Sequence, residues 1–253
     1  MCAASPEPAR ARRLAALYDL HGNVFALDAV LAEARSEGVD LVVFGGDLAW
    51  GAFPHETVER AFDPGLPAAY VRGNGDREMA APVADGDDWV SEITRWCAAR
   101  LDERQRAALG AQPAHATVRV DGLGDVLFCH GSPRSDEESL TFLTPEERLG
   151  EATAGVDAPV VVCGHTHMQF DRTCGGIRVV NAGSVGMPYE GRPGAYWCLL
   201  DASGITLRRT EYDFEAAAAA IAGSGVPYAT EMARDVLSPP GRDETAAQFE
   251  GGG

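Results

Sequence analysis

The 253-residue sequence contains no lysine, so all 21 of its basic residues are arginines. The absence of lysine excludes mechanisms that need a Schiff-base lysine or the lysine of a phosphate-binding P-loop. The sequence also has no glycine-rich GxGxxG motif, which leaves nucleotide-cofactor chemistry without support.

Paired cysteines and long apolar runs are missing as well. The six cysteines form no CxxC pair, so the sequence does not suggest a structural zinc module. No apolar run approaches the roughly 20 residues of a membrane-spanning helix, and the first residues lack the apolar core of a secretion signal. We therefore expect reduced thiols, a cytoplasmic location and no membrane partner.

Positive charge is scarce. The chain has 38 acidic and 21 basic residues, which gives a formal net charge of −17. Affinity for a long nucleic acid comes mainly from neutralising its phosphates, so this balance argues against such a partner. An acidic surface can instead attract divalent cations.

The length and the 45% hydrophobic content suffice for one α/β domain. We expect a domain over residues 14–237, a flexible N-terminus over 1–13 and a flexible C-terminal tail over 238–253. The tail prediction rests on the proline, glycine and charge of "LSPPGRDETAAQFEGGG".

From residue 14 onward, apolar strands alternate with helical patterns, which indicates parallel strands joined by crossover helices. Residues 76–112 interrupt this rhythm and predict a helical insertion. We interpret its Trp89 and Trp96 as buried anchors, although a helical segment over 87–109 could also cap a cleft. Short strands follow, so the expected fold class is α/β, with a mixed sheet or a two-sheet sandwich and helices outside.

Polar residues follow five of the apolar strands. The stretches are "LYDLHGN" with Asp19 and His21, "VVFGGD" with Asp47, "YVRGNGD" with Asn74, "VLFCHG" with His130, and "VVVCGHTH" with His165 and His167. Each could be a turn or a packed histidine if it stood alone. Five in succession predict a crevice at the carboxyl ends of the strands. Imidazole and carboxylate ligands without thiolate suit Mn²⁺, Fe, Zn²⁺, Ni²⁺ or Co²⁺.

As an ordered set, "DLHGN", "GGDL", "GNGD", "CHG" and "GHTH" resemble the motifs of the calcineurin-like metallophosphoesterase superfamily, and "VNAGSVGMP" resembles a loop of its small phosphodiesterase branch. The resemblance implies a four-layer αββα sandwich with two divalent metal ions, Mn²⁺ foremost. One ion would take Asp19, His21 and His167, and the other would take Asn74, His130 and His165. Asp47 would bridge both.

The function implied by this resemblance is that of a metal-dependent phosphoesterase, and foremost a phosphodiesterase. It would hydrolyse a small phosphate ester by a hydroxide that bridges the metals, with Asp47 and Asn74 as catalytic residues. The alternatives are a phosphomonoesterase acting on a protein or nucleotide, and a metal-binding scaffold without catalysis. The sequence does not indicate an oligomeric state.

The sequence departs from the family pattern in the third motif, where many members have a histidine and this chain has Gly75. A missing general acid typically costs about 10²–10⁴-fold for a poor leaving group, which favours phosphodiesters or activated esters. Asp76 and His115 are candidate acids, but we prefer to interpret both as solvated loop residues. Tyr18 replaces a small serine and is expected to narrow the cleft.

Two further residues are candidate substrate contacts. Asn23 can order the turn after the first motif or reach the phosphate. Arg77 can meet the phosphate or pair with nearby acids.

Overall fold

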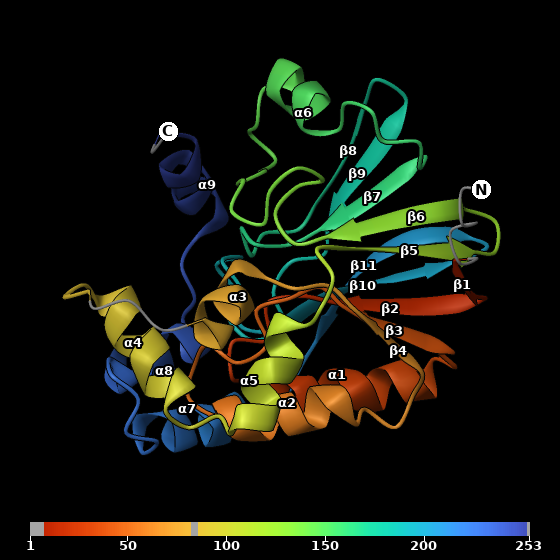
Figure 1. Cartoon of the computed structure of the whole chain (residues 1–253). Helices are drawn as coiled ribbons and strands as arrows, with labels where there is room; N and C mark the ends of the chain where they lie inside the picture. Colours follow the sequence, from red (N-terminus) through yellow and green to blue (C-terminus); the bar gives the residue numbers. More distant parts are fainter. Residues whose placement is uncertain (1–7, 82–85, 252–253) are drawn as a thin grey trace.

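The computed structural model describes residues 8–81 and 86–251. Two β-sheets pack face to face, with helices outside them (Figure 1). One sheet has six strands in the order β1-β5-β6-β7-β9-β8, and the other has five in the order β11-β10-β2-β3-β4. Both contain parallel and antiparallel pairs. The expected sandwich of two mixed sheets is confirmed.

The strands are β1 (Ala9–Ala11), β2 (Arg13–Leu17), β3 (Leu41–Phe44), β4 (Ala68–Tyr70), β5 (His115–Val120), β6 (Gly124–Cys129), β7 (Val160–Cys163), β8 (Phe170–Cys174), β9 (Ile177–Asn181), β10 (Ala195–Asp201) and β11 (Gly204–Thr210). The helices are α1 (Val24–Ser36), α2 (Pro54–Phe62), α3 (Asn74–Ala80), α4 (Trp89–Ala98), α5 (Glu103–Gly110), α6 (Glu146–Ala152), α7 (Phe214–Ala222), α8 (Ala229–Leu237) and α9 (Arg242–Gly251).

The central strands are apolar throughout because both of their faces are covered. In β2, Leu14 and Ala16 belong to the core between the sheets. Ala15 and Leu17 point the other way, into the core beneath the helices. A strand buried on both faces has no polar alternation, and this explains the unbroken hydrophobic runs that precede the polar motifs.

Tyr18 continues β2 into the core between the sheets, so the prediction that it narrows the cleft is wrong. Its side chain is fully buried, and its hydroxyl donates a 2.9 Å hydrogen bond to the carbonyl of Val162 in the opposite sheet. A Cβ on Gly45 would lie only 2.0 Å from the tyrosine ring. A glycine on the neighbouring loop therefore makes room for an aromatic ring where a serine was expected.

Helices α1 and α2 lie against the five-stranded sheet (Figure 1). α1 begins at Asn23, whose side-chain oxygen accepts the amide of Ala26 at 3.1 Å, as a good N-cap does. α2 begins with Pro54, a residue suited to the first turn because it needs no amide partner there.

The insertion over 76–112 is helical, as predicted, in its described parts: the end of α3, then α4 and α5. Residues 82–85 lie outside the described residues. Ile93 and Cys97 of α4 are fully buried, but Trp89 is 53% exposed, so the interpretation of Trp89 as a buried anchor is wrong. Trp96 is partly buried and packs beneath the guanidinium of Arg100.

The predictions of flexible ends are wrong in two places. Ala9–Ala11 form β1, which pairs in parallel with β5; residues 1–7 lie outside the described part of the chain. Near the other end, Arg242–Gly251 form α9. Both elements depend on partners more than 100 residues away in the sequence, which local composition does not reveal.

Candidate metal centre

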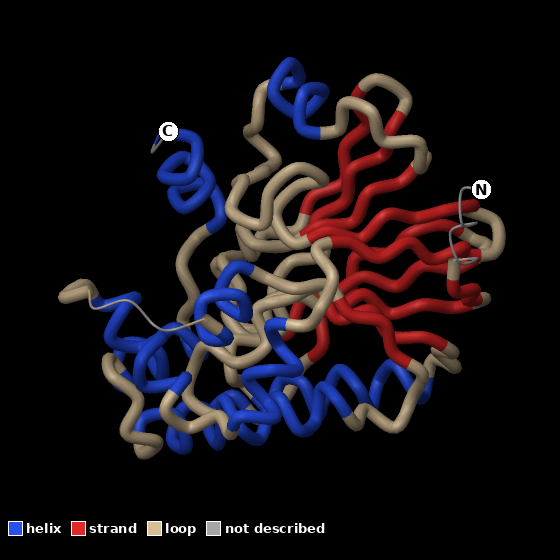
Figure 2. The backbone as a smooth tube through the Cα atoms, viewed as in Figure 1, coloured by secondary structure: helices blue, strands red, loops and turns tan. Residues whose placement is uncertain are grey.

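The loops that follow the strands gather at one end of the sandwich (Figure 2). β2, β3 and β4 run parallel in one sheet, and β6 and β7 run parallel in the other. The carboxyl ends of these five strands therefore bring all seven predicted ligand residues to this region.

Five of the predicted ligands have a left-handed backbone. Their φ angles lie between 44° and 66°, and the residues are Asp19, His21, Asp47, His165 and His167. Only one other described non-glycine residue, Tyr228, has a positive φ. Such a conformation costs of order 1–3 kcal/mol per residue, and it is typical of sites whose side chains must point in one required direction.

Backbone hydrogen bonds between neighbouring loops maintain these conformations. The amide of Asp19 donates to the carbonyl of Gly46, and that of His21 donates to the carbonyl of Asp47, both at 3.0 Å. Gly46 has a φ of 99°, and a Cβ there would lie 2.4 Å from the amide nitrogen of Gly73. The first two motifs are thus joined by main-chain hydrogen bonds, and the third motif packs closely against the second.

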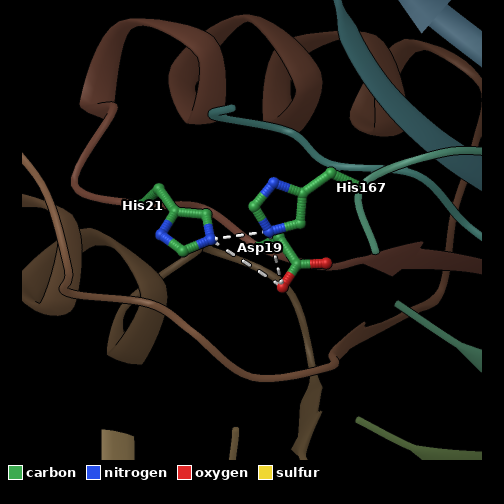
Figure 3. Close-up of side chains that lie close together, drawn as sticks. All are labelled: Asp19, His21 and His167. Atoms are coloured by element: carbon green, nitrogen blue, oxygen red, sulfur yellow. Dashed lines mark hydrogen bonds and ion pairs between the residues drawn. The ribbon is translucent and has the colours of Figure 1, made fainter. Parts of the chain in front are cut away.

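Asp19, His21 and His167 form the first cluster of candidate ligands (Figure 3). The Nε2 atoms of the two histidines are 2.9 Å apart. Asp19 Oδ1 lies 3.9 Å from Nε2 of His21 and 3.6 Å from Nε2 of His167. Three potential ligand atoms therefore face one point from three buried side chains.

The other ring nitrogens of these histidines are occupied. Nδ1 of His21 donates to the carbonyl of Trp50 at 3.1 Å, and Nδ1 of His167 donates to that of Met187 at 2.7 Å. Burial lowers the pKa of both rings. Neutral rings with the proton on Nδ1 leave the Nε2 lone pairs facing each other, which is the arrangement a metal cation requires.

The second cluster contains Asp19, Asp47 and His130. Nε2 of His130 lies 3.6 Å from Asp47 Oδ2, 3.8 Å from Asp19 Oδ1 and 3.1 Å from Asn74 Oδ1. Its Nδ1 donates to the carbonyl of Gly45 at 2.8 Å. The ring of His165 lies beside that of His130, with 5.2 Å between centroids. His165 is adjacent to this cluster rather than within it.

The carboxylate of Asp19 connects the two clusters. Its Oδ2 accepts the amide of His165 at 2.8 Å, but its Oδ1 is buried without a hydrogen-bond partner. Burial raises the pKa of Asp19 to about 8. A buried carboxylate oxygen with no partner is costly, and a cation at this point would satisfy it.

Charge in the second cluster is shared between His130 and Asp47. Burial alone would lower the pKa of His130, but the carboxylates of Asp47 and Asp19 outweigh it and raise that pKa to about 10. Burial opposes ionisation of Asp47, yet the nearby His130 brings its pKa well below the usual value. The imidazolium of His130 thus offsets the negative charge of the Asp47 carboxylate.

Asp76 fixes the backbone of the loop that carries Asp47. Its carboxylate accepts the amides of Asp47 at 2.8 Å, Leu48 at 3.0 Å and Gly73 at 3.1 Å. The amide of Gly75 donates to Asp47 Oδ1 at 2.8 Å. Asp76 is fully buried, so the interpretation of this residue as a solvated loop residue is wrong. His115 is exposed on β5, with Nε2 donating to the carbonyl of Pro133 at 2.8 Å.

The side chains of the two predicted substrate contacts, Asn23 and Arg77, bind other residues of the chain. Asn23 caps α1, and its amide nitrogen donates to the carbonyl of Gly186 and the hydroxyl of Tyr212, each at 3.2 Å. Arg77 pairs with Asp136 at 2.8 Å and with Glu137 at 2.6 Å. Of the alternatives that the sequence leaves open, the structure favours the turn-ordering role for Asn23 and acid pairing for Arg77.

A cavity of about 290 Å³ opens in front of the clusters. Among its lining residues are five predicted ligands: His21, Asp47, Asn74, His165 and His167. Trp89 and Val90 also line it, as the alternative that residues 87–109 cap a cleft would require, and Gly75 of the third motif does too. The other lining residues were not predicted as site residues: Trp50, Glu78, Met187, Tyr189 and Phe249. These five are not ligand positions of the motifs, so the motif pattern did not indicate them.

Residues 13–204 match the model of the calcineurin-like phosphoesterase superfamily domain. The chain therefore belongs to this family, which indicates a metal-dependent phosphoesterase, a hydrolase. An uncharacterized protein of Methanocaldococcus jannaschii is 25% identical over 236 residues, covering 85% of this chain and 93% of its own.

Two solved structures share the fold. A hypothetical protein of Pyrococcus horikoshii has a TM-score of 0.79 at 19% identity, and a metallophosphoesterase of Sphaerobacter thermophilus has a TM-score of 0.74 at 24% identity. Each comparison covers 90% of this chain and 99% of the other. Within the described residues, no helix is both long and apolar enough to cross a membrane.

Proposed function

We propose that this chain is a phosphodiesterase that hydrolyses a small phosphate ester with two divalent metal ions. The observation that carries the proposal is a group of potential ligand atoms that face one another at the strand ends without a hydrogen donor between them. Asp19 Oδ1 has no partner, and the Nε2 atoms of His21 and His167 face it and each other within 3.9 Å. A cation placed among these three atoms would accept their lone pairs.

The donor set suits two ions. Asp19, His21 and His167 would hold the first, and Asn74, His130 and His165 would hold the second, with Asp47 between them. Oxygen and imidazole donors without thiolate fit Mn²⁺, which we propose first, and also Fe, Zn²⁺, Ni²⁺ or Co²⁺. Such ions, when bound, lower the pKa of a coordinated water and stabilise charge on phosphate oxygens.

The chain's own residues orient this centre. The carbonyls that accept Nδ1–H of His21, His130 and His167 hold the rings with Nε2 toward the ligand site. Such supporting contacts typically contribute 10- to 100-fold to metal affinity or activity. Asn74 would present its oxygen to a metal ion and donate its amide N–H to a phosphate oxygen.

The third motif supports a diester or an activated ester. Gly75 has no side chain that could protonate a leaving alkoxide, and its Cβ position lies only 3.1 Å from Asp47 Oδ1. The absence of an acid there disfavours substrates with poor leaving groups. We further propose a small-molecule substrate rather than a long nucleic acid, on the basis of the net charge of −17, and a cytoplasmic location.

The test is an assay of chelator-treated protein with and without Mn²⁺, comparing bis-p-nitrophenyl phosphate with p-nitrophenyl phosphate. We expect metal-dependent cleavage of the diester, and a loss of about 100-fold or more in Asp47→Asn. Asp243→Asn, an exposed residue of α9, is the matched control and should retain activity. Preference for the monoester would favour a phosphatase, and failure to bind metal would contradict the proposal.

A further inference from the structure

The cavity in front of the candidate ligands has aromatic walls that come from outside the metal-binding motifs. Trp50 follows β3, Trp89 begins α4, Tyr189 lies after the last motif, and Phe249 comes from α9. The insertion and the C-terminal helix thus both contribute a ring to the same cavity.

Trp89 is exposed although its helix is well packed. Its indole lies edge-to-face against Trp50 at 5.8 Å, and 53% of its surface is accessible. Ile93 and Cys97, one and two turns along the same helix, are fully buried and anchor α4 without it. An exposed indole that lines the cavity is therefore available to a ligand.

Phe249 belongs to α9, and contacts of the neighbouring Glu250 hold this helix in place. Glu250 accepts hydrogen bonds from Thr141 and Thr144 at 2.6 Å each and pairs with Arg148 at 3.0 Å. Ala246, one turn earlier, is fully buried. These contacts hold α9 so that Phe249 lines the cavity.

Phe249 and Tyr189 also line a neighbouring cavity of about 420 Å³, beside Asp235, Thr245 and Gln248. Tyr189 is stacked on the ring of His167, with 4.7 Å between centroids. A second cavity therefore adjoins the one beside the candidate metal centre at these two rings.

No arginine is found among the described residues that line these two cavities, and the histidines that line them are candidate metal ligands. Glu78 and Asp235 contribute negative charge instead. Arg77 is paired with Asp136 and Glu137, and Arg242 pairs with Glu190. A substrate that carried further phosphates away from the reacting one would meet like charge here.

We propose that the substrate is a phosphodiester with an uncharged planar aromatic substituent, an aryl group or a nucleobase, that packs against Trp89 and Phe249. Stacking on aromatic side chains is tolerant of ring identity and contributes substantially to affinity. This inference rests on the proposed phosphodiesterase function, because it places the reacting phosphate at the candidate metal centre.

The test keeps the leaving group constant and changes the other substituent. With Mn²⁺-loaded protein, kcat/KM is measured for bis-p-nitrophenyl phosphate and for methyl p-nitrophenyl phosphate, which release the same phenolate. The ratio of the two values is then compared between variants, so that the intrinsic reactivity of the esters cancels. Affinity for methyl(phenyl)phosphinate, which has no ester bond to hydrolyse, gives a second readout and is measured by calorimetry.

We expect Trp89→Ala and Phe249→Ala each to lower the aryl-to-methyl ratio by about tenfold, mainly through KM, and to weaken methyl(phenyl)phosphinate binding similarly. Trp89→Phe should restore most of the ratio. Trp96→Ala, on the same helix but outside the cavity lining, is the matched control and should leave the ratio unchanged.

A charged substrate provides the second comparison. The p-nitrophenyl ester of thymidine 5′-phosphate should be cleaved with a kcat/KM about tenfold or more above that of the same compound with an added 3′-phosphate. Metal-dependent cleavage with ratios unchanged in Trp89→Ala and Phe249→Ala, or a preference for the added phosphate, would overturn the inference alone. Failure of metal-dependent cleavage with every ester would instead overturn the proposed function on which it rests.

Discussion

At the scale of single residues, the candidate centre is held in a state that is unfavourable without a cation. Asp19 is fully buried, one of its oxygens lacks a partner, and burial raises its pKa to about 8. The neighbouring carboxylates raise the pKa of His130 to about 10 despite its burial. At neutral pH the Asp19 carboxyl and the His130 ring therefore hold protons.

Metal binding should accordingly release protons. Asp19 and His130 are protonated at pH 7 because their pKa values, about 8 and about 10, lie above that pH, whereas ligands must be deprotonated. We predict that Mn²⁺ affinity rises as the pH increases from about 6 to 8. Calorimetric titrations in two buffers of different ionisation enthalpy measure the protons released, and a pH-independent affinity without proton release would refute this prediction.

Asp76 offers a test of the support behind the ligands. Asp76→Ala would leave three buried amides, of Asp47, Leu48 and Gly73, without their acceptor. We predict a loss of about 3 kcal/mol in the free energy of unfolding measured in urea, and Mn²⁺ binding weakened by about 10- to 100-fold. His115→Ala, exposed on β5, should change neither. Unaltered metal binding in Asp76→Ala would show that the orientation of Asp47 does not depend on this residue.

The gathering of the candidate ligand residues at one end of the sandwich could be predicted from the sequence because each follows an apolar strand. The contacts that fix other side chains of these motifs and of the insertion could not be predicted. Tyr18 and Asn23 look like cleft residues in the linear sequence, but Val162 and Gly186, the residues that hold them, lie more than 140 residues further along. Trp89 has the spacing of a core residue, and only the fold shows that its face opens onto the cavity.

At the scale of elements, the structure gives a functional position to α9, a segment that the sequence predicted as a flexible tail. Its proline, glycine and charge are typical of a disordered end, yet Glu250 and Arg242 attach it to distant loops. β1 was missed for a related reason, since its three residues gain order from pairing with β5. The helical patterns that alternate with the strands could be predicted, because apolar spacing is a local property of the sequence.

The attachment of α9 can be tested at Glu250. Glu250→Ala would remove the acceptor shared by Thr141 and Thr144 and the ion pair with Arg148. We predict faster hydrogen exchange of the amides of residues 242–251, with little change in the strands. Glu244→Ala, an exposed residue of the same helix, is the control. Equal exchange in both variants would indicate that α9 is held by other contacts.

At the scale of the whole molecule, the two sheets act together. Each sheet supplies only part of the centre: β2, β3 and β4 position one group of ligands, and β6 and β7 position the other. The alternation of strands and helices predicted parallel strands, and the family resemblance predicted the sandwich. The sequence left open that residues 87–109 cap a cleft, but it could not predict that the C-terminal helix α9 lines the same cavity.

The central claim is that this junction holds two metal ions, and anomalous diffraction from a crystal soaked in Mn²⁺ tests it most directly. We predict two peaks, one within ligand distance of Asp19, His21 and His167, and the other beside Asn74, His130 and His165, with Asp47 between them. An Asp47→Asn crystal treated in the same way should lose density at one or both positions. Absence of peaks at the wild-type clusters, or peaks only elsewhere on the acidic surface, would contradict the account.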